Sequence, residues 1–197
     1  MCGRYIANSE DEITEIREIL KQISLRFVSA EFDANSALSD IYPTNKVMII
    51  NKSDGVTPVK WGIEKWDGKA VIINAKSETY EQSGFFKPFA KNRCVIPAHG
   101  YYEWMTMQDK SKQKYAFTSK NNKGIFMTGI MKPSQEKLSD NNRFAIITRP
   151  AQENILHIHA RMPLIIFAEQ IEQWLSGKLS VQDIREQDTE ITFEQAV

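Results

Sequence analysis

The stretch RCVIPAHGYYEWMTM, residues 93–107, carries the fold signal on which the rest of the chain can be arranged. It predicts one strand over Arg93–Pro97 and a second over Tyr101–Met107. Side chains alternate along a strand, so Tyr101 and Glu103 fall on one face of the second strand and Tyr102 and Trp104 on the other. A charged carboxylate among aromatic side chains is costly to bury, and burial would raise the pKa of Glu103 into a range suited to proton transfer. A solvent-facing glutamate on an edge strand is the alternative.

The same kinds of signal recur on both sides of this stretch. Further strands are predicted at Arg4–Ala7, Lys46–Asn51, Val56–Trp61, Val71–Ile73, Lys114–Thr118, Ile125–Ile130 and Phe144–Thr148. Helices are predicted after a Ser9/Glu12 capping box (with Ile13, Ile16, Ile19, Leu20 and Ile23 on one face), after Asn74, from Pro150, and over Ala168–Ser176 before Gly177. Many strands with scattered helices predict an α+β fold, a single domain over residues 1–197 built on a mostly antiparallel, barrel-like sheet with peripheral helices.

Composition and charge limit the classes of protein that fit. The chain has 197 residues, 42% of them hydrophobic, which suffices for one core, and no apolar run approaches the roughly 18 residues that span a bilayer. With two cysteines and no signal peptide, we expect a cytoplasmic protein without a membrane partner. Lys plus Arg equals Asp plus Glu at 25 each, yet residues 76–149 hold 13 basic against 6 acidic residues. That excess predicts either a phosphate-facing side or a solvated lysine-rich hairpin.

The amino-terminal sequence MCGRY, residues 1–5, offers unusual chemistry. Removal of Met1 would leave Cys2 with an α-amine and a thiol on adjacent carbons, with ordinary pKa values of about 8 and about 8.5. An amine forms a Schiff base with an aldehyde, and the neighbouring thiol can close on the imine carbon to give a five-membered thiazolidine. The alternative is that Cys2 is an ordinary residue on a frayed end.

Two other polar stretches stand where a core does not require them. Asn74 and Lys76 directly follow an apolar strand, so either they meet at a common mouth or Asn74 caps a helix. His159 and Arg161 lie two residues apart, which suits proton transfer near neutral pH and bidentate phosphate binding, although histidines in apolar company are more often structural.

An aromatic set completes the candidate features. Trp61, Trp66, Tyr102 and Trp104 could stack on unpaired bases or wedge a duplex end, with core packing as the alternative for each.

The sequence gives no reason to expect a metal or a cofactor. The Cys and His spacings lack the paired pattern of zinc sites, and the chain has no glycine-rich phosphate loop, no Gly-x-Ser-x-Gly elbow and no dinucleotide fingerprint.

Seven motifs in order resemble one known family. They are MCGRY at 1–5, YPT at 42–44, WG at 61–62, NAKSET at 74–79, RCVIPA at 93–98, GYYEW at 100–104 and HARMP at 159–163. Together they are similar to the SRAP family, the SOS response-associated peptidases, better described as abasic-site processing proteins. The resemblance implies covalent capture of abasic sites in single-stranded DNA, especially at junctions with duplex, through a thiazolidine on Cys2.

The resemblance also implies residue roles. Cys2, Asn74, Glu103 and His159 are expected to be catalytic, and the expected DNA-binding residues are Arg4, Pro43, Trp61, Lys76, Trp104, Thr148, Arg161 and Met162. No metal or cofactor is implied, and a monomer is expected. An associated abasic-site lyase activity and self-removal of Met1 are further expectations.

This chain departs from the family pattern in a few places. Lys76 replaces the usual Arg, so a phosphate there would meet the single charge of an ammonium group and not the two parallel hydrogen bonds of a guanidinium. His99 and Ala160 stand where Asp is common in the family.

Two other functions stay open on the sequence. One is an N-terminal-nucleophile cysteine hydrolase or peptidase, and the other is a noncatalytic module that binds single-stranded DNA without using Cys2.

Overall fold

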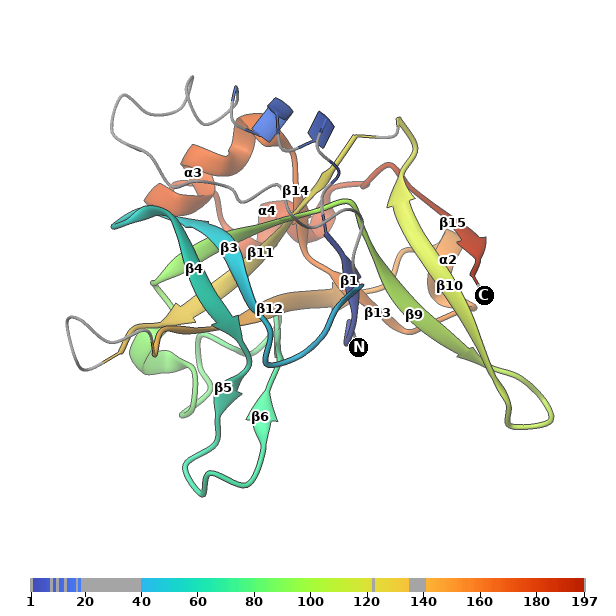
Figure 1. Ribbon diagram of the computed structural model, residues 1–197, viewed down its shortest axis with the longest axis horizontal. Helices are drawn as coiled ribbons and strands as arrows, with labels where there is room; N and C mark the ends of the chain where they lie inside the picture. The colour runs from blue at the N-terminus through green and yellow to red at the C-terminus, as the bar shows by residue number, and fades with distance from the viewer. Residues whose placement is uncertain are drawn as a thin grey trace.

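Strands are the main regular structure in the computed structural model of the chain (Figure 1). The structure describes residues 2–7, 9, 11–12, 14–16, 18, 40–121, 123–134 and 141–196. The strands are β1 (Tyr5–Ile6), β2 (Asp40–Ile41), β3 (Lys46–Asn51), β4 (Gly55–Trp61), β5 (Ile63–Glu64), β6 (Val71–Ile72), β7 (Asn74–Lys76), β8 (Arg93–Ala98), β9 (Gly100–Thr106), β10 (Lys112–Ser119), β11 (Ile125–Lys132), β12 (Arg143–Pro150), β13 (Arg161–Pro163), β14 (Ile165–Ile166) and β15 (Ile191–Gln195). The helical elements are η1 (Lys87–Phe89), α2 (Glu153–Leu156), η2 (Ala168–Gln170), α3 (Ile171–Ser176) and α4 (Val181–Glu186).

The largest sheet closes on itself. Pairing runs from β12 to β4, β3, β8 and β11 and returns from β11 to β12, while β7 and β13 also pair with β12 and β14 pairs with β11. A second sheet has the order β15-β10-β9-β1-β2, and β5 and β6 form a separate hairpin. All pairings among the described strands are antiparallel except those of β12 with β4 and with β7. The predicted α+β class with a mostly antiparallel, barrel-like sheet and few helices is confirmed.

The central strands explain why the sheet closes. Every residue of β11 from Ile125 to Met131 is buried, as is β12 from Phe144 to Arg149, so these strands are covered on both faces. Gly129 permits the close approach of their neighbours, because a Cβ there would lie 2.7 Å from Ile96 Cδ1 and 2.9 Å from Cys94 Sγ. One of the two buried clusters joins residues of both large sheets, and it contains Cys2.

The structure corrects two predicted helices. Asn74 does not precede a helix, because Asn74–Lys76 forms β7 and turns follow it. Pro150 does not open a helix either: it ends β12 opposite Arg161, where a missing N–H is tolerated, and α2 begins three residues later at Glu153. The helical segment Ala168–Ser176 is confirmed as η2 and α3, and Gly177 ends it with φ 80°.

The predicted amino-terminal helix is partly described. The backbone N–H of Ser9 donates to Glu12 Oε2 at 2.8 Å and the Glu12 N–H donates to Ser9 Oγ at 3.3 Å, which confirms the capping box. Ile16 is buried, whereas Ile13, Ile19, Leu20 and Ile23 lie outside the described residues. Among the described helices, none is long and apolar enough to cross a membrane.

Candidate active site and nucleic-acid interface

Strand pairing fixes the position of Cys2. Tyr5 of β1 lies opposite Tyr101 of β9, and the N–H of Tyr102 donates to the carbonyl of Arg4 at 2.9 Å. This pairing brings the segment before β1 alongside β9, and Cys2 is 0% exposed within the cluster shared by the two sheets. The alternative of a frayed end is therefore wrong about where Cys2 lies.

Asn74 reaches Cys2 from the other sheet. The parallel pairing of β7 with β12 sets Asn74 opposite Ile146, and its Nδ2 donates to the Cys2 carbonyl at 2.9 Å. Its Oδ1 is buried, with no hydrogen-bond partner among the residues that the structure describes. A buried acceptor of this kind is a place for a donor from a substrate or from a processed chain end.

Glu103 lies on the inner face of β9. It is 2% exposed, and burial raises its pKa above that of an ordinary glutamate. The alternative of a solvent-facing edge residue is wrong, because β9 lies between β10 and β1 and Glu103 points inward. The raised pKa that the sequence predicts for Glu103 is confirmed.

Burial also raises the pKa of the Cys2 thiol, and the nearby charge of Glu103 raises it further. The thiol is therefore protonated at neutral pH in this environment. Cysteine nucleophiles that attack as thiolates have lowered pKa values instead.

His159 approaches Glu103 from the loop between α2 and β13. Its Nδ1 lies 3.7 Å from Glu103 Oε1, and the backbone N–H of Arg161 donates to Nδ1 at 3.0 Å. Nδ1 also lies 3.0 Å from the carbonyl oxygen of Arg161, so it accepts from the Arg161 N–H in one tautomer of the neutral ring and donates to the Arg161 carbonyl in the other. The side chain is 28% exposed, so His159 can meet both the buried carboxylate and a ligand from solvent.

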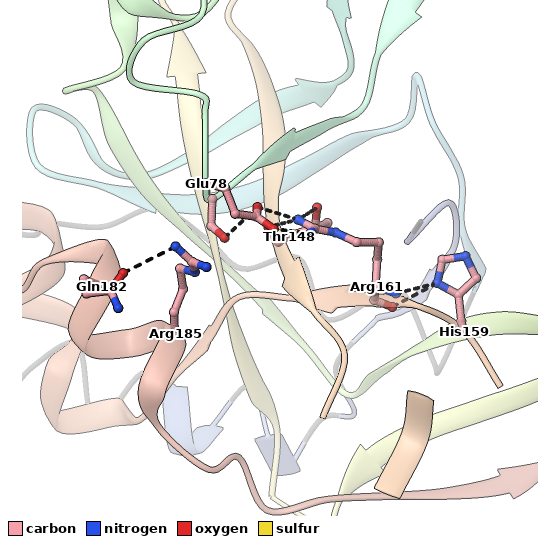
Figure 2. Close-up of polar contacts among 7 residues, drawn as sticks. Glu78, Thr148, His159, Arg161, Gln182 and Arg185 are labelled. Carbon is pink, nitrogen blue, oxygen red and sulfur yellow. Dashed lines mark hydrogen bonds and ion pairs between the residues drawn. The ribbon is translucent and has the colours of Figure 1, made fainter. Parts of the chain in front are cut away.

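Arg161 is held by the protein itself (Figure 2). Nη1 and Nη2 form a bidentate pair with Glu78, with Nη2 2.9 Å from Oε2, and Nη2 also donates to the Thr148 carbonyl at 2.6 Å. The Arg161 guanidinium lowers the pKa of Glu78 to about 2. Thr148 is 0% exposed, and its carbonyl and hydroxyl accept hydrogen bonds from Arg161; the expected contact of Thr148 with DNA stays a prediction.

Two more expected DNA contacts lie in the core. Trp61 and Met162 are both 0% exposed, and Trp61 packs on Tyr5 at 5.3 Å between ring centroids while its Nε1 donates to the Ile73 carbonyl. Both side chains pack in the core in this conformation, and their expected contacts with DNA stay predictions. Trp66, in the β5–β6 hairpin, is 84% exposed, and its ring centroid lies 5.8 Å from that of Phe85.

The remaining expected DNA-binding residues lie at the surface or close to it. Lys76 is exposed at the end of β7, Trp104 is half-buried on the outer face of β9, and Pro43 is half-buried in the turn after β2. The guanidinium of Arg4 lies 4.4 Å from the Tyr42 ring centroid and 5.2 Å from that of Trp104.

The sequence did not single out three residues that shape this region. Glu78 belongs to the motif NAKSET, in which only Asn74 and Lys76 were predicted to have a role. Glu78 and Arg161 are 83 residues apart in the chain, so only the fold could bring them together. Asp40, which pairs with Arg4 at 3.3 Å, carries no sequence signal. Tyr101 was placed on the inner face with Glu103, but its buried hydroxyl, unpaired within the described part of the chain, was not foreseen.

No three His, Cys, Asp or Glu side chains among the described residues are placed to hold a metal ion.

The fold and the site define a strand-rich protein in which a buried cysteine near the amino terminus lies close to an asparagine and a glutamate, with a histidine beside the glutamate. The model of the family described as "SOS response associated peptidase (SRAP)" matches residues 1–195, and the chain belongs to this family. Its relatives include abasic site processing protein YedK of Escherichia coli, 28% identical over 94% of this chain and 84% of that protein. Abasic site processing protein YoqW of Bacillus subtilis is 29% identical over 90% of this chain and 81% of that protein.

Solved structures show the same fold. A crystal structure of a protein from Bacteroides thetaiotaomicron aligns with a TM-score of 0.76 at 23% identity, over 98% of this chain and 91% of that chain.

Proposed function

We propose that this protein processes abasic sites in single-stranded DNA by forming a covalent thiazolidine crosslink through Cys2 after loss of Met1. The observation that carries the proposal is the convergence on Cys2 of Asn74 and Glu103 from two different sheets, with His159 next to Glu103. The names of the relatives YedK and YoqW supply the substrate class.

The chemistry proceeds in two steps. The Cys2 amine attacks the aldehyde carbon of the ring-opened sugar, and loss of water gives an imine. The thiol then adds across the imine: its sulfur bonds to carbon and its proton moves to nitrogen. The closed ring removes the iminium that would otherwise promote β-elimination and break the strand.

The state of the thiol favours this order. Burial keeps the Cys2 thiol protonated, so the amine is the first nucleophile and the thiol enters with its proton. The same property weighs against a cysteine hydrolase or peptidase, whose first step needs a thiolate.

Neighbouring groups have matching roles in this proposal. Asn74 Oδ1 accepts a hydrogen bond from the Cys2 amine and so aims its lone pair, since Nδ2 is already fixed on the Cys2 carbonyl. Glu103 in its protonated form delivers the proton that turns the carbinolamine hydroxyl into water. His159 assists opening of the sugar ring from the solvent side.

The wider interface follows from what is exposed. In this proposal Arg4, Lys76, Trp66 and Trp104 contact a DNA strand, and Trp66, the most exposed of these rings, stacks at a junction with duplex. We further propose that the chain acts as a single domain and as a monomer.

Denaturing gel electrophoresis tests the proposal. Protein whose loss of Met1 is verified by mass is incubated with single-stranded DNA that carries one abasic site. We expect a shifted band that survives heat without borohydride. Cys2→Ala keeps an α-amine and should give a band only when borohydride traps the imine.

Cys94→Ala is the matched control, because Cys94 is equally buried but its thiol has no α-amine on the adjacent carbon. It should crosslink like the unmodified chain. A heat-stable band in Cys2→Ala, or none in the unmodified protein, would overturn the proposal. In the second case, salt-sensitive binding that survives Cys2→Ala would identify a noncatalytic binding module.

A further inference from the structure

An open cavity of about 390 Å³ lies between the end of β12 and the end of α4. The end of β12 and the turn that follows it contribute residues 149–153, and α4 with the segment after it contributes Gln182 and residues 185–188. None of these residues has a role in the proposed function, so the cavity is a separate feature of the molecule.

Arg149 is the buried cation of this cavity. It is 3% exposed, and its Nη1 donates to the carbonyls of Arg185 at 2.8 Å and of Gln187 at 2.7 Å, at the carboxyl end of α4. Its Nε and Nη2 are buried and have no hydrogen-bond partner among the described residues. These two nitrogens form one edge of the guanidinium, and their parallel N–H groups match two oxygens of one anion. The unused edge is therefore a binding position for an oxyanion.

Arg93 makes the same kind of contact at the end of α3 without leaving such an edge. Its Nη1 donates to the carbonyls of Leu179 at 2.6 Å and of Trp174 at 3.3 Å, and its guanidinium lies 4.1 Å from the centroid of the Trp174 ring. No Arg93 nitrogen is both buried and without a partner in the described part of the chain. Holding a helix end against the sheet thus does not require an unpaired edge, and the edge of Arg149 needs another explanation.

The carboxylates of the cavity do not pair with its arginines. Asp188 and Glu186 accept hydrogen bonds from the side-chain amides of neighbouring glutamines, and Glu153 is exposed. Within the described residues, the hydrogen bonds of Arg149 and Arg185 go to carbonyl oxygens and to no carboxylate. Burial lowers the pKa of Arg149, and the charge of Asp188 offsets only part of that effect. An anion in the cavity would supply the missing compensation.

Two further buried atoms indicate which anion fits. Arg185 Nε is a donor and Gln187 Oε1 is an acceptor, and neither has a partner among the described residues. Together with the edge of Arg149, the cavity offers three N–H donors and one acceptor. Hydrogen phosphate matches this set, because three of its oxygens can accept hydrogen bonds and its hydroxyl can donate one. Sulfate has no hydroxyl at neutral pH, and a carboxylate lacks both the hydroxyl and the third oxygen.

We propose that this cavity binds inorganic phosphate, with two oxygens on the free edge of Arg149, a third on Arg185 Nε, and the hydroxyl donating to Gln187. Because the free atoms are buried, the lining side chains must shift as the anion enters. Arg185 is held by one printed contact, from Nη1 to Gln182 Oε1 at 3.3 Å (Figure 2), and we expect this hydrogen bond to open. The inference does not depend on the proposed function.

Thermal unfolding of the full chain at neutral pH tests the inference. Sodium phosphate is compared with sodium chloride, sulfate and acetate at matched ionic strength. An anion that binds only the folded chain raises the midpoint of unfolding, and at about five times the Kd phosphate should raise it by about 2–4 °C over chloride. Sulfate should give a smaller shift, and acetate none. A nucleoside monophosphate should also give less, because its ester oxygen replaces the hydroxyl.

Four variants locate the site. Arg149→Lys keeps the charge but removes the two-pronged edge, and the phosphate shift should disappear. Arg93→Lys is the matched control, because it weakens the same kind of contact at the end of α3 and should keep the full shift. Arg185→Gln leaves Arg149 in place and should reduce the shift, which tests the site even if Arg149→Lys fails to fold. Lys76→Gln, on the surface that we propose for DNA, should keep the shift.

Three results would overturn the inference. The first is a phosphate shift no larger than that of sulfate, and the second is a shift that both Arg149→Lys and Arg185→Gln retain. The third is a shift that Lys76→Gln abolishes, because phosphate would then bind at the surface proposed for DNA. An equal or larger shift with the nucleoside monophosphate would overturn the choice of free phosphate as the ligand.

Discussion

The two faces of β9 differ in what they do with the same run of residues. Tyr101 and Glu103 point inward and are 1% and 2% exposed, whereas Tyr102 and Trp104 point outward beside cations. Burial shifts proton affinities on the inner face, and accessible charge and ring surface serve binding on the outer face. Because side chains alternate along the strand, we expect the inner face of β9 to serve catalysis and the outer face to serve binding. Substitutions on the inner face should then change the crosslinking rate, and those on the outer face should change the affinity for DNA.

The inner face should show the largest effect. Glu103→Gln removes the acid that we assign to proton transfer, and the rate of crosslink formation at saturating DNA should fall about 10²-fold or more. Noncovalent affinity should stay the same, because the side chain is buried. Single-turnover gels across pH measure the rate: with Glu103 the rate should fall as pH rises through its raised pKa, and the glutamine variant should lack that decline.

The stability of the same variant gives an independent check. The folded-state pKa of Glu103 lies above its unfolded value, so the protonated residue contributes stability below the unfolded pKa and that contribution is lost as pH rises through the folded pKa. Glu103→Gln should then be the more stable protein at neutral pH. A destabilised variant with an unchanged pH profile would mean that Glu103 has only a packing role.

The outer face should respond in binding alone. Trp104→Ala removes a stacking ring and one of the two rings over Arg4, and the noncovalent affinity for single-stranded DNA should fall by about 1–3 kcal/mol. Fluorescence anisotropy measures this change, and Trp104→Phe should restore most of it. If the saturated crosslinking rate fell while affinity held, the separation between the two faces would be refuted.

The smallest effect is expected away from both faces, at the pair of Glu78 with Arg161. Glu78→Gln breaks the bidentate pair and should lower the free energy of unfolding by about 1–2 kcal/mol at neutral pH. The folded-state pKa of Glu78 is lowered to about 2, so this stability is present above the unfolded pKa near 4.5 and is lost as pH falls toward 2. Denaturant unfolding at several pH values measures it.

Glu172→Gln, on the exposed surface of α3, is the control for this prediction and should change stability little. A stability difference between the unmodified protein and Glu78→Gln that persisted at the lowest pH would contradict the ion-pair explanation.

The structure agrees with the sequence where local pattern is sufficient. The strand pair 46–51 and 55–61, the inward direction of Glu103, the Ser9/Glu12 capping box and the end of α3 at Gly177 all depend on residues close in the chain. Prediction failed at Asn74 and Pro150, where pairing with β12 or β13 across the fold overrode local helix signals.

The candidate site likewise contains features that the sequence predicted and features that only the fold decided. The family motifs predicted catalytic roles for Cys2, Asn74, Glu103 and His159, but they could not distinguish exposed from buried tryptophans. Trp61 and Trp66 stand five residues apart and are 0% and 84% exposed, because Trp61 ends a strand of the closed sheet and Trp66 lies in the turn of the β5–β6 hairpin.

The sequence by itself determined the fold class, the family and the residue types available for chemistry, because strand alternation and motif order are properties of neighbouring residues. Only the tertiary structure decided which of them meet. Cys2 and Asn74 are 72 residues apart, and Arg161 and Glu78 are 83 apart, so their contacts exist only after the sheets pair. Burial, which raises the pKa of Glu103 and keeps the Cys2 thiol protonated, is likewise a property of the packed molecule and not of the local sequence.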